Sequence, residues 1–119
     1  MSPISAQTIE TLNAVLDRFG VTGTSIRDIR SGRVNKHWRV ETPGETFVLR
    51  RYHERRLAGA IEYEHDVLRH LESRAWPVAA PLPVPGCSQT ALEAAGRRYA
   101  LFRLLPGRPG RLPTAATRA

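Results

Sequence analysis

Glu64 is an acidic residue at a position where the helical pattern of the chain predicts an apolar one. Ile61, Leu68 and Leu71 have the spacing that a helix gathers onto one face. Glu64 lies on the same stripe, and a buried carboxylate is costly unless a positive group meets it. Arg50, at the end of an apolar run, is the nearest candidate in sequence order. A cation held by a carboxylate in this way is suited to neutralising phosphate groups.

Two predicted elements must position these charges, a strand that carries Arg50 and a helix that carries Glu64. Apolar periodicity, turn residues and the stop at Trp76-Pro77 set their limits. The order of elements predicts an α+β domain with a five-stranded antiparallel sheet, an N-terminal helix and one helix packed across the sheet. The predicted helices span residues 5–19 and 57–74, and the predicted strands span residues 24–30, 37–41, 46–52, 90–93 and 98–104.

The distribution of charge bears on the class of partner. The 119-residue chain, one domain at most, has a formal net charge of +7. Residues 1–93 carry 12 Lys and Arg against 11 Asp and Glu, whereas residues 94–119 carry six Arg and no acidic residue. The excess is therefore confined to the last quarter, and aromatic residues do not alternate with these cations. A small basic nucleic-acid-binding module is kept as an alternative, but nucleic acid is not an expected partner.

The chain has neither the long apolar run of a membrane span nor the start of a secretory signal. Its single cysteine, Cys87, excludes an internal disulfide framework and indicates a reducing compartment. We expect a cytoplasmic protein without a membrane partner. The histidines lack metal-ligand spacing, so no metal site is expected; they are His37, His53, His65 and His70.

Four segments, in this order and spacing, carry a resemblance to a known family. The chain resembles the aminoglycoside phosphotransferase family, which includes choline-kinase-like and homoserine-kinase-like small-molecule kinases. The resemblance covers about residues 5–110 and only the amino-terminal lobe, so it implies a protein-kinase-like N-lobe that binds ATP. The segments are Asn35-x-x-Trp38-Arg39-Val40, Phe47-Val48-Leu49-Arg50, Glu64-x-x-Val67-Leu68-x-x-Leu71 and Tyr99-Ala100-Leu101-Phe102-x-Leu104-Leu105-Pro106-Gly107.

The resemblance implies roles for the first matched residues. Ser31, Gly32 and Asn35 would belong to a loop over the nucleotide phosphates, and an ordinary hairpin turn is the alternative. Arg50 matches the strand cation that contacts the α- and β-phosphates, and the alternative is a solvated arginine at a strand end. Glu64 matches the helix carboxylate that orients this cation, and the alternative is a solvent-facing glutamate.

Further along the chain, Phe102, Arg103 and Leu104 match the connector whose main-chain groups read the adenine edge. The alternative is that they are only part of an inner strand. Arg51, next to Arg50, is expected to point to the opposite face of the sheet, where it would be a surface residue.

Phosphoryl transfer also needs Mg²⁺ and a carboxylate that positions the attacking hydroxyl. In the family these groups come from beyond the connector, whereas the last aspartate here is Asp66 and the last acidic residue is Glu93. We therefore expect no catalytic residue, an ATP-binding N-lobe over residues 1–105, and a hinge remnant with a disordered tail over residues 106–119. The chain alone is expected to be inactive.

Mg²⁺ and the small-molecule acceptor are expected only with the missing C-lobe. The acceptor stays open among an aminoglycoside, homoserine, choline or another hydroxyl compound. A non-catalytic interaction domain of the same fold is the remaining alternative.

Overall fold

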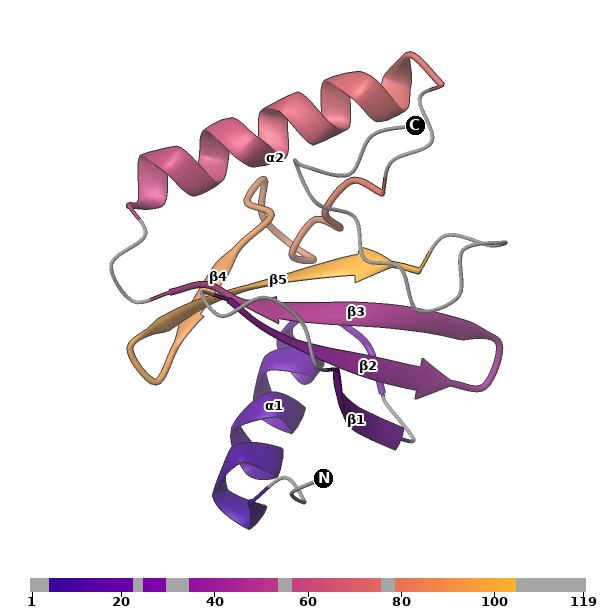
Figure 1. The fold of residues 1–119 in the computed structure, drawn as a ribbon, viewed down its shortest axis with the longest axis vertical. Coiled ribbons are helices and arrows are strands. Elements are labelled where there is room, and N and C mark those ends of the chain that lie inside the picture. Colours follow the sequence, from indigo (N-terminus) through magenta and orange to yellow (C-terminus); the bar gives the residue numbers. More distant parts are fainter. Residues whose placement is uncertain (1–4, 23–24, 30–34, 54–56, 76–78, 105–119) are drawn as a thin grey trace.

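The fold is a five-stranded antiparallel sheet with one helix on each face (Figure 1). The computed structural model describes residues 5–22, 25–29, 35–53, 57–75 and 79–104. The elements along the chain are α1 (Ala6–Arg18), β1 (Ser25–Ile29), β2 (Lys36–Thr42), β3 (Glu45–Arg51), α2 (Ala58–Ser73), β4 (Leu92–Ala94) and β5 (Arg97–Arg103).

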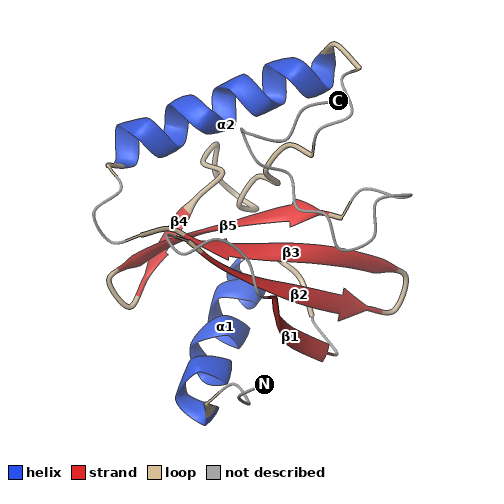
Figure 2. Cartoon of the chain, in the orientation of Figure 1, coloured by secondary structure: helices blue, strands red, loops and turns tan. Residues whose placement is uncertain are grey.

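The strands lie in the order β1-β2-β3-β5-β4, and each neighbouring pair is antiparallel (Figure 2). Arg50 on β3 is opposite His37 on β2 and Ala100 on β5. Successive side chains of a strand point to opposite faces, so Arg50 faces α2 whereas Leu49 and Arg51 face α1. The sheet register therefore decides which side chains meet the second helix.

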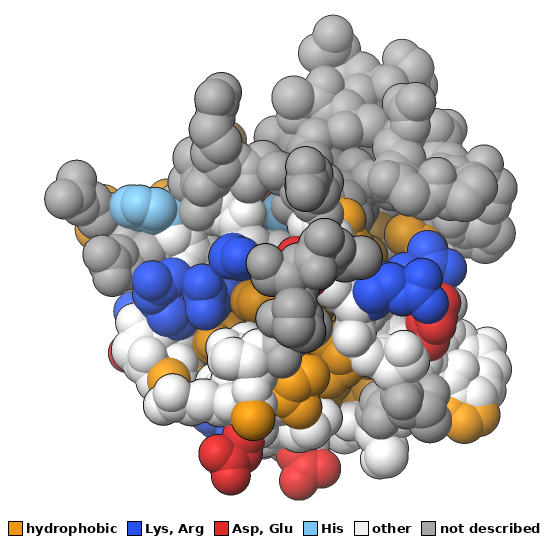
Figure 3. All heavy atoms as spheres, turned by 60° about the horizontal axis from the view of Figure 1, so that its bottom comes forward, with side chains coloured by type: hydrophobic (Ala, Val, Ile, Leu, Met, Phe, Trp, Pro, Cys, Tyr) orange, Lys and Arg blue, Asp and Glu red, His pale blue; other side chains and the backbone are white. Residues whose placement is uncertain are grey.

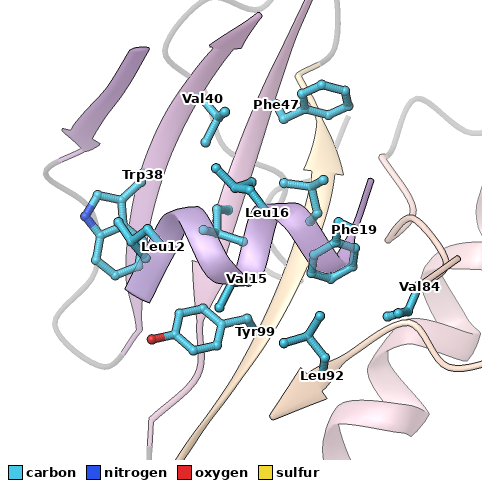
Figure 4. Close-up of a cluster of buried hydrophobic side chains, with 12 residues drawn as sticks. Leu12, Val15, Leu16, Phe19, Trp38, Val40, Phe47, Val84, Leu92 and Tyr99 are labelled. Carbon is cyan, nitrogen blue, oxygen red and sulfur yellow. The ribbon is translucent and has the colours of Figure 1, made fainter. Parts of the chain in front are cut away.

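Helix α1 covers the face of the sheet that carries Trp38 and Val40 (Figure 4). Its first turn is capped by Ser5, whose hydroxyl accepts a hydrogen bond from the N–H of Thr8 at 3.1 Å. Gly20 follows the helix with a φ of +77°, a conformation that favours glycine. The core between helix and sheet contains Leu12, Val15, Leu16, Phe19, Trp38, Val40, Phe47, Leu49, Val84, Leu92, Tyr99 and Leu101.

Helix α2 covers the opposite face with a smaller apolar cluster. Ile61 and Leu68 are the buried aliphatic residues of the helix, and Leu71 is half-buried. Because several members of this cluster are alanines, polar side chains fill part of the space between α2 and the sheet. The cluster contains Tyr52, Ile61, Leu68, Ala79, Ala80, Ala100 and Phe102.

The α+β fold predicted from the sequence is confirmed, and the ends of the helices and strands agree with the prediction to within two residues. The largest difference is at β4, which starts at Leu92 because Thr90 lies outside the ladder and turns its hydroxyl toward His65. Residues 105–119, which include the predicted tail, lie outside the described residues. In the described part of the chain, no helix is long and apolar enough to cross a membrane.

Candidate functional site

The guanidinium group of Arg50 is buried between β3 and α2. The residue is 3% exposed, and its Nη1 atom lies 3.4 Å from Oε2 of Glu64. Nη1 also donates to the hydroxyl of Tyr52 at 3.2 Å, and Nε donates to Nε2 of His37 at 3.1 Å. The guanidinium carbon lies 4.7 Å from the ring centre of Phe102, a distance suited to a cation–π contact. Among the described residues, four side chains therefore hold the orientation of this cation.

The sheet register explains why these groups meet. His37 is directly across from Arg50 on β2, and the small Ala100 is directly across on β5. Phe102 lies two residues farther along β5 and therefore on the same face. Glu64 comes down from α2, at the third position after the buried Ile61.

A second set of hydrogen bonds continues from the Arg50–Glu64 ion pair toward β4. The hydroxyl of Tyr52 donates to Oε1 of Glu64 at 2.9 Å and lies 2.8 Å from Nε2 of His65. On the other side of the imidazole ring, Nδ1 of His65 lies 2.7 Å from the hydroxyl of Thr90. These contacts join the segment just after β3, helix α2 and the segment before β4. We call Tyr52, Glu64, His65 and Thr90 the α2 network.

The positions of the protons follow from the contacts. Tyr52 has one hydroxyl proton, and it points to Glu64 because an ionised carboxylate can only accept. Nε2 of His65 must then donate to the Tyr52 oxygen, and in the neutral ring, which burial favours, Nδ1 accepts from Thr90. His65 is therefore the neutral Nε2–H tautomer. By the same reasoning, Nε2 of His37 carries no proton because it accepts from Arg50.

Burial favours the neutral forms of these groups. Burial, helped by the positive charge of Arg50, lowers the pKa of His37 to about 4. Burial also lowers the pKa of His65 to about 4, although the carboxylate of Glu64 opposes this shift. The pKa of the Tyr52 hydroxyl is raised, chiefly by burial. At neutral pH the two imidazole rings and the Tyr52 hydroxyl are thus uncharged.

The structure brings together three of the residues that the sequence singled out, Arg50, Glu64 and Phe102. Arg50 is 3% exposed, and the side chain of Glu64 is 18% exposed. Arg50 is therefore not a solvated arginine and Glu64 is not a solvent-facing glutamate, the two alternatives that the sequence left open. Phe102 is fully buried. The Arg50–Glu64 ion pair is the centre of the candidate site.

The other predicted residues lie elsewhere. The side chain of Arg103 is exposed and pairs with Glu45. The main-chain N–H of Leu104 donates to the carbonyl oxygen of Thr46 at 3.0 Å, so it continues the sheet. The side-chain oxygen of Asn35 accepts from the N–H of His53 at 3.0 Å. Ser31 and Gly32 lie outside the described residues.

Sequence reasoning missed several members of the site. His65, which the sequence suggested only as a possible metal ligand, is 1% exposed and lies between Tyr52 and Thr90 in the α2 network. Its spacing from Ile61 and Leu68, at i+4 and i−3, marked it as a residue of the buried helical face. Arg51 faces away from Arg50 as predicted, but it is half-buried over the ring of Trp38 and is not a surface residue.

The other charged and metal-ligating side chains bear on two other kinds of site, a metal centre and a basic surface. Among the described residues, no group of three or more His, Cys, Asp or Glu could hold a metal ion. On the face drawn in Figure 3, the visible Lys and Arg side chains form two separate groups with hydrophobic side chains between them.

The chain is similar to known phosphotransferases. The sequence profile of the phosphotransferase enzyme family matches residues 25–119. No curated protein matches the chain. Spectinomycin phosphotransferase APH(9)-Ia, solved with ADP and spectinomycin, has a TM-score of 0.64 and 13% sequence identity over 88% of this chain and 31% of its own.

Two further solved structures agree with this result. Aminoglycoside phosphotransferase APH(4)-Ia has a TM-score of 0.58 and 19% identity, over 84% of this chain and 30% of its own. A candidate aminoglycoside phosphotransferase from Ralstonia eutropha has a TM-score of 0.57 and 27% identity, over 84% of this chain and 28% of its own. The chain thus spans less than a third of the length of the structures that it matches. The matched profile covers most of the sequence, and the chain belongs to the phosphotransferase enzyme family.

Proposed function

We propose that this chain is the nucleotide-binding lobe of an ATP-dependent phosphotransferase that acts on a hydroxyl group of a small molecule. The observation that carries the proposal is the Arg50–Glu64 ion pair, held between a central strand and the helix across it. Membership of the family and the presence of ADP in a solved structure of the same fold support it.

The chemistry of the donors fits a phosphate ligand. The guanidinium group of Arg50 keeps its charge at any ordinary pH and offers planar donors that match phosphate oxygens. We propose that Arg50 contacts the phosphates and that Glu64 keeps its guanidinium group in position. Phe102, packed on the guanidinium group, would then lie near the boundary between the phosphate and base positions.

The base position is proposed at the end of β5. Because the N–H of Leu104 already donates to Thr46, a base contact there would use main-chain carbonyl groups of Arg103 or Leu104. We propose that the loop with Ser31, Gly32 and Asn35 covers the phosphates on the side away from Arg50. Bound ATP would supply the phosphoryl group, with Mg²⁺ neutralising its oxygens.

The groups that act on the acceptor are proposed to come from outside residues 1–105. The sequence has no aspartate after Asp66, and the family chemistry needs a carboxylate to position the attacking hydroxyl. We propose residues 106–119 as the start of the connection to a second lobe, and catalytic inactivity for the 119-residue chain by itself. Solved relatives with spectinomycin and with hygromycin B support an aminoglycoside-like acceptor for the complete enzyme.

The test is a binding titration of the chain with a fluorescent ATP analogue. We expect saturable binding and at least a tenfold weaker Kd in Arg50→Gln, because a charge-assisted contact to phosphate is lost. Arg51→Gln is the matched control, since Arg51 is the adjacent residue on the opposite face. Absence of binding by the unmodified chain, or equal losses in both variants, would contradict the proposal and favour a non-catalytic interaction domain.

A further inference from the structure

The hydroxyl of Tyr52 is the centre of the polar contacts under α2. It lies 2.9 Å from Oε1 of Glu64 and 3.2 Å from Nη1 of Arg50. It also lies 2.8 Å from Nε2 of His65. The direct contact between Arg50 and Glu64, at 3.4 Å, is longer than any of these. The carboxylate of Glu64 is therefore held more closely by Tyr52 than by the cation with which it pairs.

The Tyr52 hydroxyl is in turn held from behind. His65 donates to it from α2, and Thr90 donates to the far side of the His65 ring from the segment before β4. All three residues are buried, so water does not compete for these hydrogen bonds. Each rotatable group of the α2 network is thus fixed by the next, from Thr90 to Glu64.

We infer that Tyr52 is a positioning residue of the phosphate site, and that His65 and Thr90 hold its hydroxyl in place. The inference rests on the proposed function for the identity of the ligand. Tyr52 acts through Glu64: without the hydroxyl, the carboxylate loses a donor at 2.9 Å that helps to hold it beside Arg50. The guanidinium group of Arg50 then loses two of the contacts that orient it, the hydroxyl itself and the aligned carboxylate.

Tyr52→Phe tests this role because it removes the hydroxyl and keeps the buried ring. We expect the Kd of the chain for a fluorescent ATP analogue to rise about tenfold, since hydrogen bonds to charged groups are being lost. Tyr63→Phe is the matched control, because Tyr63 lies on α2 but is 72% exposed. Circular dichroism establishes that both variants are folded. If Tyr52→Phe does not fold, Thr90→Val gives the same test from the far end of the network.

A double-mutant cycle separates positioning from general packing. If Tyr52 acts through Glu64, Tyr52→Phe should weaken binding in the unmodified chain but have little further effect in a Glu64→Ala background, which has no acceptor for the hydroxyl. His65→Gln keeps an N–H donor in place of Nε2 and should bind more tightly than His65→Leu. Equal effects of Tyr52→Phe in both backgrounds would overturn the inference, as would full affinity in Tyr52→Phe.

A measurement without nucleotide keeps the two proposals distinguishable. The Nε–H of Arg50 donates to His37 in a buried site, so its exchange with solvent, followed by ¹⁵N NMR, should be slow. We expect exchange about tenfold faster in Tyr52→Phe and unchanged in Tyr63→Phe. Failure of the unmodified chain to bind the ATP analogue would defeat the proposed function alone. Unchanged exchange in Tyr52→Phe would defeat the positioning role alone.

Discussion

Replacing Glu64 with glutamine should destabilise the fold strongly, because it leaves the buried guanidinium group of Arg50 facing a neutral amide. The side chains of Arg50 and Glu64 are 4% and 18% exposed and lie 3.4 Å apart. With an effective dielectric constant of about 20, unit charges at this distance attract by about 5 kcal/mol. Loss of one partner of a buried ion pair usually costs about 3–5 kcal/mol.

The expected loss for Glu64→Gln is at the lower end of that range, about 3 kcal/mol, because His37 still accepts from Arg50 and Glu64 is partly exposed. For a chain of 119 residues such a loss corresponds to a fall in Tm of about 12 °C. Urea unfolding at pH 7, followed by circular dichroism, measures it. Glu62→Gln, an exposed position on the same helix, is the control and should change the free energy of unfolding by less than about 0.5 kcal/mol.

A second variant tests whether the ion pair serves binding or stability. Replacing both partners together, Arg50→Met with Glu64→Leu, leaves no unpaired charge and should recover most of the stability lost in Glu64→Gln. The same double variant should not bind the ATP analogue. The reasoning is refuted if Glu64→Gln costs no more than Glu62→Gln, or if the double variant is less stable than Glu64→Gln.

Three further predictions concern stability. The free energy of unfolding should fall between pH 6.5 and about pH 4, by up to about 1.4 kcal/mol per pH unit for each of His37 and His65. The unfolded chain takes up these protons near pH 6.5 and the folded chain does not, so a pH series of urea titrations should show a shallower slope in His65→Gln. Gly20→Ala should lower the free energy of unfolding by about 1 kcal/mol, since Gly20 has a positive φ. Gly59→Ala, in α2 with open space around it, should raise the free energy of unfolding by up to about 1 kcal/mol. Thermal unfolding measures both, and a change in the same direction in both variants would contradict the prediction. Ser5→Ala should lower stability by about 1 kcal/mol through loss of the α1 cap, and an unchanged Tm would show that the cap is not formed in solution.

The parts of the site that were predicted from the sequence depend on local periodicity. An acidic residue on an apolar helical stripe and a cation at a strand end were enough to pair Glu64 with Arg50. The same periodicity marked His65 as buried, but a histidine was weighed only as a metal ligand. Tyr52 was missed because an aromatic residue at a strand end fits an ordinary core position equally well.

Other contacts could not be derived from the sequence because they join distant segments. Thr90 meets His65 across 25 residues, and nothing in either segment specifies the partner of the other. The pairing of Leu104 with Thr46 depends on β5 lying next to β3, which follows from the order of strands in the sheet and not from their own residues. The burial of Arg51 over Trp38 likewise depends on the register between β2 and β3.

The sheet separates two cores of unequal strength. Among the residues that the structure describes, twelve buried hydrophobic residues pack on the α1 side and seven on the α2 side, and three of those seven are alanines. Local opening should therefore detach α2 at a lower free energy than α1, and amide protection in the native state should rank the two helices in that order. Each such opening carries Glu64 away from Arg50 while the rest of the lobe stays folded. The fraction of molecules in which the ion pair is formed is therefore set by the attachment of α2 to the sheet and not by the global free energy of unfolding.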